Sequence, residues 1–262
     1  MDADVALYKE APEKIRARFA EITAMDRAIG QLRSYLRRER LAGNTLLWYC
    51  GDNGTPPEAR LNMLFRGAKG SIYDGGLRVP GIVEWPDVIR KPRMTDINAV
   101  TSDILPTLCA VVDAPLPARP LDGIDLRPAL EGRLRERPGP ICFWHYDPSR
   151  ERNEEPYLPA EVQRGTTPTT QQANIAFNNR RHSRARTSDF GGAAAILEGR
   201  HKLVEPQGKA LELYDVIADP GETNDIAATG AATVKRMEGQ LRDWQRSVEI
   251  SLTGADYRQT AT

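Results

Sequence analysis

The chain has 262 residues, and its 36 lysines and arginines equal its 36 aspartates and glutamates, so the formal net charge is zero. A balanced charge provides no global field that selects nucleic acid or an anionic membrane, and we expect neither as a partner. Charged residues at 27% and apolar residues at 40% are typical of a globular protein with a buried core. The three cysteines, Cys50, Cys109 and Cys142, have no CxxC spacing, which disfavours structural zinc and a disulfide framework.

The first half of the sequence predicts alternating helices and strands. A long helix is expected to open at Pro12-Glu13, with one buried stripe formed by Ile15, Phe19, Ile22, Ile29, Leu32 and Leu36. Residues 45–50 predict a strand buried on both faces, as in parallel sheets, and residues 79–85 predict a second strand. Ser102-Asp103 is expected to cap the next helix. This order of elements indicates an α/β fold.

The pattern changes after residue 146. Residues 147–190 show no periodic spacing of apolar residues, which favours a solvated, flexible insertion. Their arginines could attract a polyanion by charge, but we prefer the interpretation as a solvated loop. Beyond it we expect strands at 193–197, 201–205 and 211–215. A final helix is expected to place one apolar face on them, comprising Val234, Met237, Leu241, Trp244 and Val248. The predicted division is therefore an α/β domain at 1–146, an insertion at 147–190 and a small α+β subdomain at 191–262.

Polar residues follow the first predicted strand abruptly. Cys50-Gly51-Asp52-Asn53-Gly54 ends an apolar run, and Gly67-Ala68-Lys69-Gly70 follows on the next loop. A carboxylate and a carboxamide are oxygen ligands that suit a hard cation, and a lysine between glycines suits an oxyanion. Taken alone, however, Asn53-Gly54 is a strong turn dipeptide and Lys69 could be an ordinary surface lysine.

Motifs along almost the whole chain resemble the sulfatases of the alkaline-phosphatase-like superfamily, specifically the C-terminal half of such an enzyme. They occur in family order: Ile22–Gly30, Asp52-Asn53-Gly54, Arg66–Ser71, Asp74–Val83, Asp103–Leu108, Leu121–Leu126, Gly199–Val204, Glu212–Asp215 and Asp219-Pro220-Gly221-Glu222. The resemblance implies part of that superfamily's α/β/α domain, followed by a small C-terminal antiparallel sheet and helix.

The resemblance also implies roles for individual residues. In that family an aspartate and an asparagine at the carboxyl end of a strand bind one calcium ion, and Asp52 and Asn53 match them. Lys69 matches a catalytic lysine that contacts the sulfate ester. Asp74 stands where the family usually has glutamate, and we expect Arg78 to pair with a carboxylate rather than touch substrate.

The family's nucleophile is a formylglycine, made from the first residue of a Cys/Ser-x-Pro-Ser/Ala-Arg motif that this sequence lacks. Tyr146-Asp147-Pro148-Ser149-Arg150 has tyrosine at the essential position, and His145, His182 and His201 do not supply the missing acid–base groups. We therefore expect a sulfatase-family protein (sulfuric ester hydrolase) for sulfate monoesters, truncated at its N-terminus and inactive alone, with an incomplete calcium site. Its partners would be a sulfate-ester small molecule or sulfated glycan, and the missing N-terminal half.

Two alternatives remain open at this point. A phosphoesterase of the same superfamily typically has Asp-His where this chain has Asp52-Asn53, because imidazole suits zinc. A non-catalytic module that binds anions or a partner chain is the second alternative. Substrate identity and localisation are not readable: family members are often periplasmic or secreted, and residues 1–5 show no secretion signal.

Overall fold

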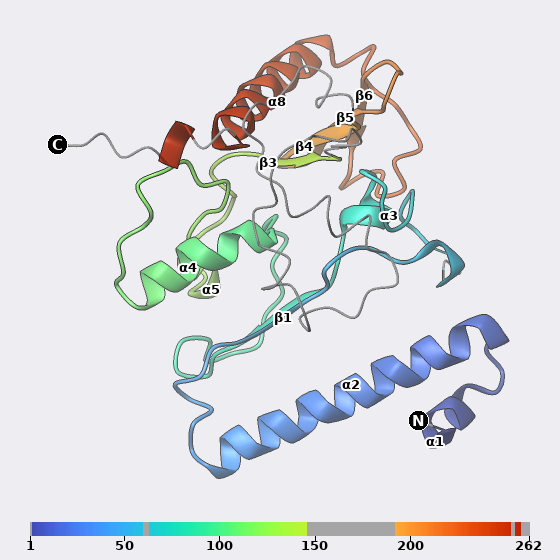
Figure 1. Cartoon of the computed structure of the whole chain (residues 1–262), viewed down its shortest axis with the longest axis vertical. Helices are drawn as coiled ribbons and strands as arrows, with labels where there is room; N and C mark the ends of the chain where they lie inside the picture. The colour runs from blue at the N-terminus through green and yellow to red at the C-terminus, as the bar shows by residue number, and fades with distance from the viewer. Residues whose placement is uncertain (1, 60–62, 146–191, 253–254, 258–262) are drawn as a thin grey trace, which may run out of the picture.

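The computed structural model describes residues 2–59, 63–145, 192–252 and 255–257, and the insertion expected at 147–190 lies outside them. It is a mixed α/β structure with a long helix beside a two-stranded sheet and a second helix over a four-stranded sheet (Figure 1). The helices are α1 (Asp2–Val5), α2 (Glu13–Arg38), α3 (Asp74–Leu77), α4 (Ile104–Val111), α5 (Arg127–Leu130) and α8 (Ala231–Leu252). The strands are β1 (Leu47–Cys50), β2 (Gly81–Glu84), β3 (Ile141–Trp144), β4 (Ala194–Glu198), β5 (His201–Glu205) and β6 (Glu212–Asp215). Among the helices in these ranges, none combines the length and the apolar character that a membrane crossing requires.

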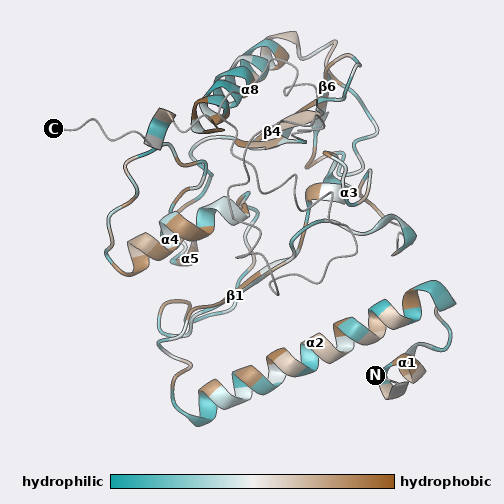
Figure 2. Cartoon of the chain, viewed as in Figure 1, coloured by the Kyte–Doolittle hydropathy of each residue, from teal (hydrophilic) through white to brown (hydrophobic). Residues whose placement is uncertain are grey.

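Helix α2 begins directly after Pro12, as the sequence predicts. The prediction of one buried stripe was wrong, because only Ile15 and Ala20 are buried on α2, whereas Ile22 is 56% exposed and Leu32 44%. Figure 2 shows hydrophobic and hydrophilic positions alternating along the whole length of α2. The N-terminal helix α1 and the turn at 57–59 pack against α2.

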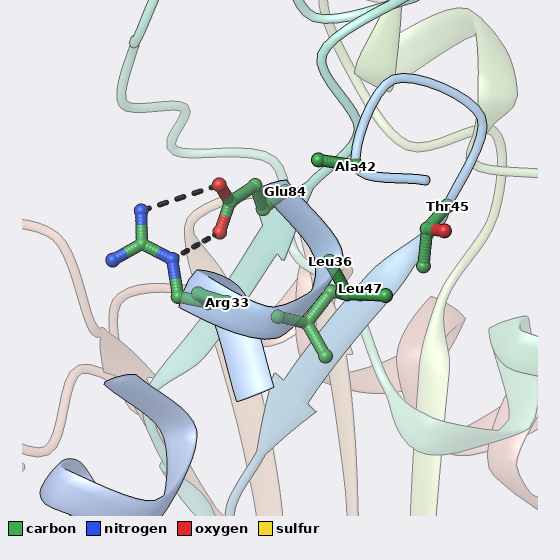
Figure 3. A pocket seen from close by; sticks show the side chains of 6 residues that line it. All are labelled: Arg33, Leu36, Ala42, Thr45, Leu47 and Glu84. Atoms are coloured by element: carbon green, nitrogen blue, oxygen red, sulfur yellow. Dashed lines mark hydrogen bonds and ion pairs between the residues drawn. The ribbon is translucent and has the colours of Figure 1, made fainter. Parts of the chain in front are cut away.

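A bidentate ion pair joins the C-terminal end of α2 to β2. Arg33 Nε donates to Glu84 Oε2 at 2.5 Å and Arg33 Nη2 donates to Glu84 Oε1 at 3.2 Å. Figure 3 shows this pair beside Leu36 and Leu47, which line a hollow of about 10 Å³. A hollow of that size holds about one water molecule, so it is a packing feature rather than a binding pocket.

Strand β1 forms where expected but pairs differently. It runs antiparallel to β2, with Leu47 opposite Glu84 and Cys50 opposite Gly81. Its residues are half-buried, so the prediction of a parallel strand buried on both faces was wrong. Among its described residues, the connection from β1 to β2 contains only the turn at 57–59 and the short helix α3, and not the long helix that usually crosses over between parallel strands.

Helix α4 begins after Asp103, as predicted, but this carboxylate does not cap it. Asp103 instead accepts hydrogen bonds from the backbone N–H groups of Val100 and Ile124, both at 2.8 Å. It also forms a buried ion pair with the Arg137 guanidinium at 2.7 Å. Asp103 therefore fixes the start of α4 to two neighbouring loops rather than satisfying the helix's own N–H groups.

The four-stranded sheet has the order β3-β4-β5-β6 and is antiparallel throughout. The expected small sheet with one covering helix is confirmed, and β3 is an additional strand that the sequence did not reveal. Helix α8 lies over one face (Figure 1). The buried core between them consists of Ala194, Ile196, Leu203, Leu213, Met237 and Leu241.

The opposite face of this sheet packs against the loop between β1 and β2. Because side chains alternate along a strand, the neighbours of the α8-facing residues point the other way. Ala195, Val204 and Tyr214 form a second core with Ile72, and Tyr73 packs against it. The C-terminal sheet is therefore a layer between α8 and the loop that carries Lys69.

Candidate functional site

Two backbone segments meet at the candidate site: residues 51–55 (the 51–55 turn) and residues 66–78 (the 66–78 loop). The Lys69 N–H donates to the Thr55 carbonyl at 2.8 Å, and the Gly54 N–H donates to the Gly76 carbonyl at 2.8 Å. The structure thus brings the predicted metal-ligand turn and the predicted substrate lysine side by side, although they are separate motifs in the sequence.

Close backbone approaches at the site require glycine at two positions. A Cβ atom on Gly54 would lie 2.1 Å from the carbonyl oxygen of Gly75. A Cβ atom on Gly76 would lie 2.1 Å from the carbonyl oxygen of Ser71. All these neighbours are backbone atoms, so a side chain at Gly54 would force the turn and the loop apart, and one at Gly76 would distort the loop itself.

The three predicted site side chains have polar atoms available. Asn53 Nδ2 donates to the Gly54 carbonyl at 3.0 Å, which leaves its Oδ1 as an acceptor. Asp52 and Lys69 are exposed, and in the part of the chain that the structure describes their side chains make no hydrogen bond or ion pair. Carboxylate and amide oxygens are the ligands that calcium takes, so the donor set fits this cation. The same described residues contain no group of three or more histidine, cysteine, aspartate or glutamate residues that could hold a metal.

Arg78 lies beside a carboxylate, as predicted. Its Nη1 is 3.7 Å from Asp74 Oδ2, and its guanidinium carbon lies 4.8 Å from the centre of the Phe65 ring.

The remaining sequence candidates lie elsewhere: His145 follows β3, His201 begins β5, and His182 is outside the described residues.

A buried ion cluster lies directly behind the site and was missed by the sequence analysis. Lys202 Nζ donates to Asp74 Oδ1 at 2.6 Å and forms an ion pair with Glu222 Oε1 at 2.8 Å. Glu222 Oε2 accepts the Asp74 backbone N–H at 2.7 Å. Burial raises the pKa of the Glu222 carboxyl, and the Lys202 charge partly offsets this. The signal was present in β5, where alternation puts Lys202 on the same face as Val204.

A second polar cluster fastens the 66–78 loop to the sheet. The Arg66 guanidinium lies 3.8 Å from the centre of the Tyr73 ring, and its Nη1 donates to the Tyr214 hydroxyl at 2.7 Å. The hydroxyls of Tyr73 and Tyr214 donate to Glu212 Oε2 at 2.6 and 2.8 Å. Burial and this hydrogen bond to the Glu212 carboxylate raise the pKa of Tyr214 to about 12, so the hydroxyl stays protonated as a donor.

The described residues form a mixed α/β fold that aligns with solved sulfatase structures over part of their domain. Residues 3–114 match the family model described as Sulfatase. The chain belongs to the sulfatase family and covers part of the length of a sulfatase protein.

The curated relatives share this partial coverage. Steryl-sulfatase of Homo sapiens is 36% identical over 135 residues, which are 48% of this chain and 23% of that protein. Arylsulfatase A of Homo sapiens is 29% identical over 228 residues, which are 84% of this chain and 41% of that protein. The chain therefore spans less than half the length of these relatives.

Solved structures show the same fold at low sequence identity. The structure of Ps i-CgsB in complex with k-i-k-neocarrahexaose is 20% identical, with a TM-score of 0.71, and the match covers 99% of this chain and 52% of that one. The structure of BT4656 with its substrate D-glucosamine-2-N,6-O-disulfate has a TM-score of 0.58 at 20% identity, covering 89% and 40%. The phosphonate monoester hydrolase of Agrobacterium radiobacter also has a TM-score of 0.58, at 22% identity, covering 88% and 41%.

Proposed function

We propose that this chain forms one wall of the active site of a sulfuric ester hydrolase that acts on sulfate monoesters. Asp52 and Asn53 are ligands of a calcium ion, and Lys69 contacts the sulfate group. The observation that supports the proposal is the direct backbone contact between the 51–55 turn, which carries Asp52 and Asn53, and the 66–78 loop, which carries Lys69.

The proposed roles follow from the chemistry of these groups. The Lys69 ammonium neutralises a sulfate oxygen and stabilises negative charge that develops on the leaving oxygen. Bound calcium supplies a fixed positive charge that polarises the sulfate ester. The hydrogen bond from Asn53 Nδ2 to the Gly54 carbonyl holds the amide, so that its oxygen remains free as a ligand.

We propose further that this wall does not turn over substrate by itself. Calcium takes about six to eight oxygen ligands, and the two assigned side chains supply a minority of them. The sequence contains no Cys/Ser-x-Pro-Ser/Ala-Arg motif from which the family's nucleophile is made. Completion therefore requires the remaining ligands and the nucleophile from a preceding segment or from a second polypeptide.

The substrate class is a small sulfate ester or a sulfated glycan. The carbohydrate complexes of Ps i-CgsB and BT4656 support the glycan, and the names of the two human relatives support a smaller sulfate ester.

A phosphoesterase is the alternative enzyme, and the fold likeness to a phosphonate monoester hydrolase favours it. Asn53 discriminates against it, because a carboxamide offers an oxygen for calcium where a zinc phosphoesterase would present imidazole. A non-catalytic anion-binding module is the alternative from another class. This alternative predicts that the isolated chain binds sulfated glycan. It also predicts that adding a further segment to the chain does not produce hydrolysis.

The proposal is tested in two stages. Reading the DNA upstream of the Met1 codon should reveal an in-frame Cys-x-Pro-Ser-Arg motif and an Asp-Asp pair, and a clean stop codon would contradict the preceding-segment version. The protein with that segment should then hydrolyse 4-nitrophenyl sulfate in the presence of calcium, whereas residues 1–262 alone should not. Hydrolysis of 4-nitrophenyl phosphate but not the sulfate would favour the phosphoesterase instead.

A further inference from the structure

The buried ion cluster of Lys202, Asp74 and Glu222 joins three segments that are far apart in the sequence. Lys202 comes from β5, Asp74 from the 66–78 loop, and Glu222 from the segment after β6. Lys202 has no solvent exposure and Glu222 has 1%. A lysine is rarely fully buried, because the loss of its hydration must be compensated by paired carboxylates.

The charge balance of the cluster is uneven. One ammonium group faces two carboxylates, at 2.6 Å from Asp74 and 2.8 Å from Glu222. If either carboxylate is neutralised, Lys202 still keeps one partner, whereas loss of Lys202 leaves Glu222 without a cation and Asp74 with only Arg78, at 3.7 Å. The cluster therefore tolerates removal of the Asp74 charge better than removal of the Lys202 charge.

The cluster is connected to the candidate site through a short stretch of backbone. Asp74 is followed by Gly75, whose N–H donates to the Arg66 carbonyl at 2.6 Å, and by Gly76, whose carbonyl accepts the Gly54 N–H at 2.8 Å. Glu222 Oε2 also holds the Asp74 N–H at 2.7 Å. Both the side chain and the backbone of Asp74 are thus fixed by the C-terminal sheet and the segment that follows it.

We propose that Lys202, Asp74 and Glu222 are positioning residues, which hold the 66–78 loop against the C-terminal sheet and thereby set Lys69 beside the 51–55 turn. The consequence for sulfate binding rests on the proposed function, but the positioning itself does not. The C-terminal subdomain is then the anchor of the candidate site rather than an independent appendage.

A purely stabilising role for the cluster makes a different prediction from a positioning role. Asp74→Asn removes the charge that pairs the loop with Lys202, so that at most a neutral hydrogen bond remains, and leaves the Lys202–Glu222 pair intact inside the sheet. If the cluster positions the loop, the loop alone should loosen. If the cluster only stabilises the fold, the loop and the sheet should change together.

Hydrogen exchange of the full chain measures this difference. Asp74→Asn should accelerate exchange about tenfold in peptides covering 51–55 and 66–78, with no change in peptides covering 201–205. Asp243→Asn on α8, which removes an exposed ion pair with Arg246, is the matched control and should change neither region. Three results would each overturn the proposal. The variant could leave exchange at 66–78 unchanged, it could accelerate exchange at 201–205 equally, or the unmodified chain could show no protection at 201–205.

A conservative variant provides a second readout. Asp74→Glu keeps the carboxylate, so exchange in both site segments should remain as slow as in the unmodified chain. If only the packing of the aspartate side chain mattered, Asp74→Glu should instead accelerate exchange. Fast exchange in Asp74→Glu would overturn the role of charge. Restored protection without any sulfate ester hydrolysis by the completed protein would leave the positioning intact and contradict only the proposed function.

Discussion

The backbone N–H of Lys69 donates to the carbonyl oxygen of Thr55 at 2.8 Å, and this bond fixes the distance between the two parts of the candidate site. Because the bond is made by the backbone, the Lys69 side chain remains available for a ligand. The contact also depends on what lies behind the 66–78 loop, since Ile72 and Tyr73 pack against the C-terminal sheet.

Gly54→Ala should destabilise the protein by about 1–3 kcal/mol, because the new methyl group would overlap the Gly75 carbonyl oxygen. Gly30→Ala is the control, since a Cβ at this position in α2 meets nothing within 4 Å. The control should stabilise the helix by up to about 1 kcal/mol. Urea unfolding monitored by circular dichroism distinguishes the two, and equal effects would contradict the close contact.

Lys202→Met should lower the free energy of unfolding by roughly 3–5 kcal/mol, because the buried Glu222 carboxylate loses its cation and Asp74 keeps only Arg78 at 3.7 Å. Combining it with Asp74→Asn and Glu222→Gln should recover most of that loss, since no buried charge then remains. Denaturant unfolding of the single and triple variants measures the difference. A triple variant that is less stable than Lys202→Met would show that the cluster's stability does not depend on charge compensation.

The Glu222 carboxyl should make stability depend on pH. Its pKa in the folded state is raised above the ordinary value of 4.5, chiefly by burial, so the folded protein binds the proton more tightly than the unfolded chain. The contribution is therefore fully present below pH 4.5 and is lost as the pH rises through the folded-state pKa. Glu222→Gln should remove this slope, and unfolding curves at several pH values check it. Parallel pH profiles for the two proteins would contradict the assignment.

Lys69→Gln should lower kcat/KM for a sulfate monoester by about 10²–10³-fold in the completed enzyme, as expected for loss of one charged group at the reacting anion. The melting temperature should not change, because the Lys69 side chain is exposed and makes no ion pair among the described residues. Lys9→Gln near the N-terminus is a matched control that should retain full activity. A fall in activity no larger than that of the control would remove Lys69 from the catalytic site.

Much of the local structure could be predicted from the sequence. The helix after Pro12, the β4–β5 hairpin and the apolar face of α8 follow from side-chain periodicity and turn residues, which act over a few positions. Those signals do not specify partners. Three features depend instead on which segments meet in space: the antiparallel pairing of β1 with β2, the exposed apolar side chains of α2, and the pairing of β3 in the second sheet.

The sequence by itself determined which groups the candidate site offers, namely a carboxylate and a carboxamide after a strand and a lysine between glycines, and it indicated the sulfatase family. Only the tertiary structure decided that Lys202 and Glu222 stand behind Asp74 and that the 66–78 loop lies between the C-terminal sheet and the 51–55 turn. The physical reason is that the cost of burying a charge is compensated by partners distant in sequence, and these partners become neighbours only when the sheet packs on the loop.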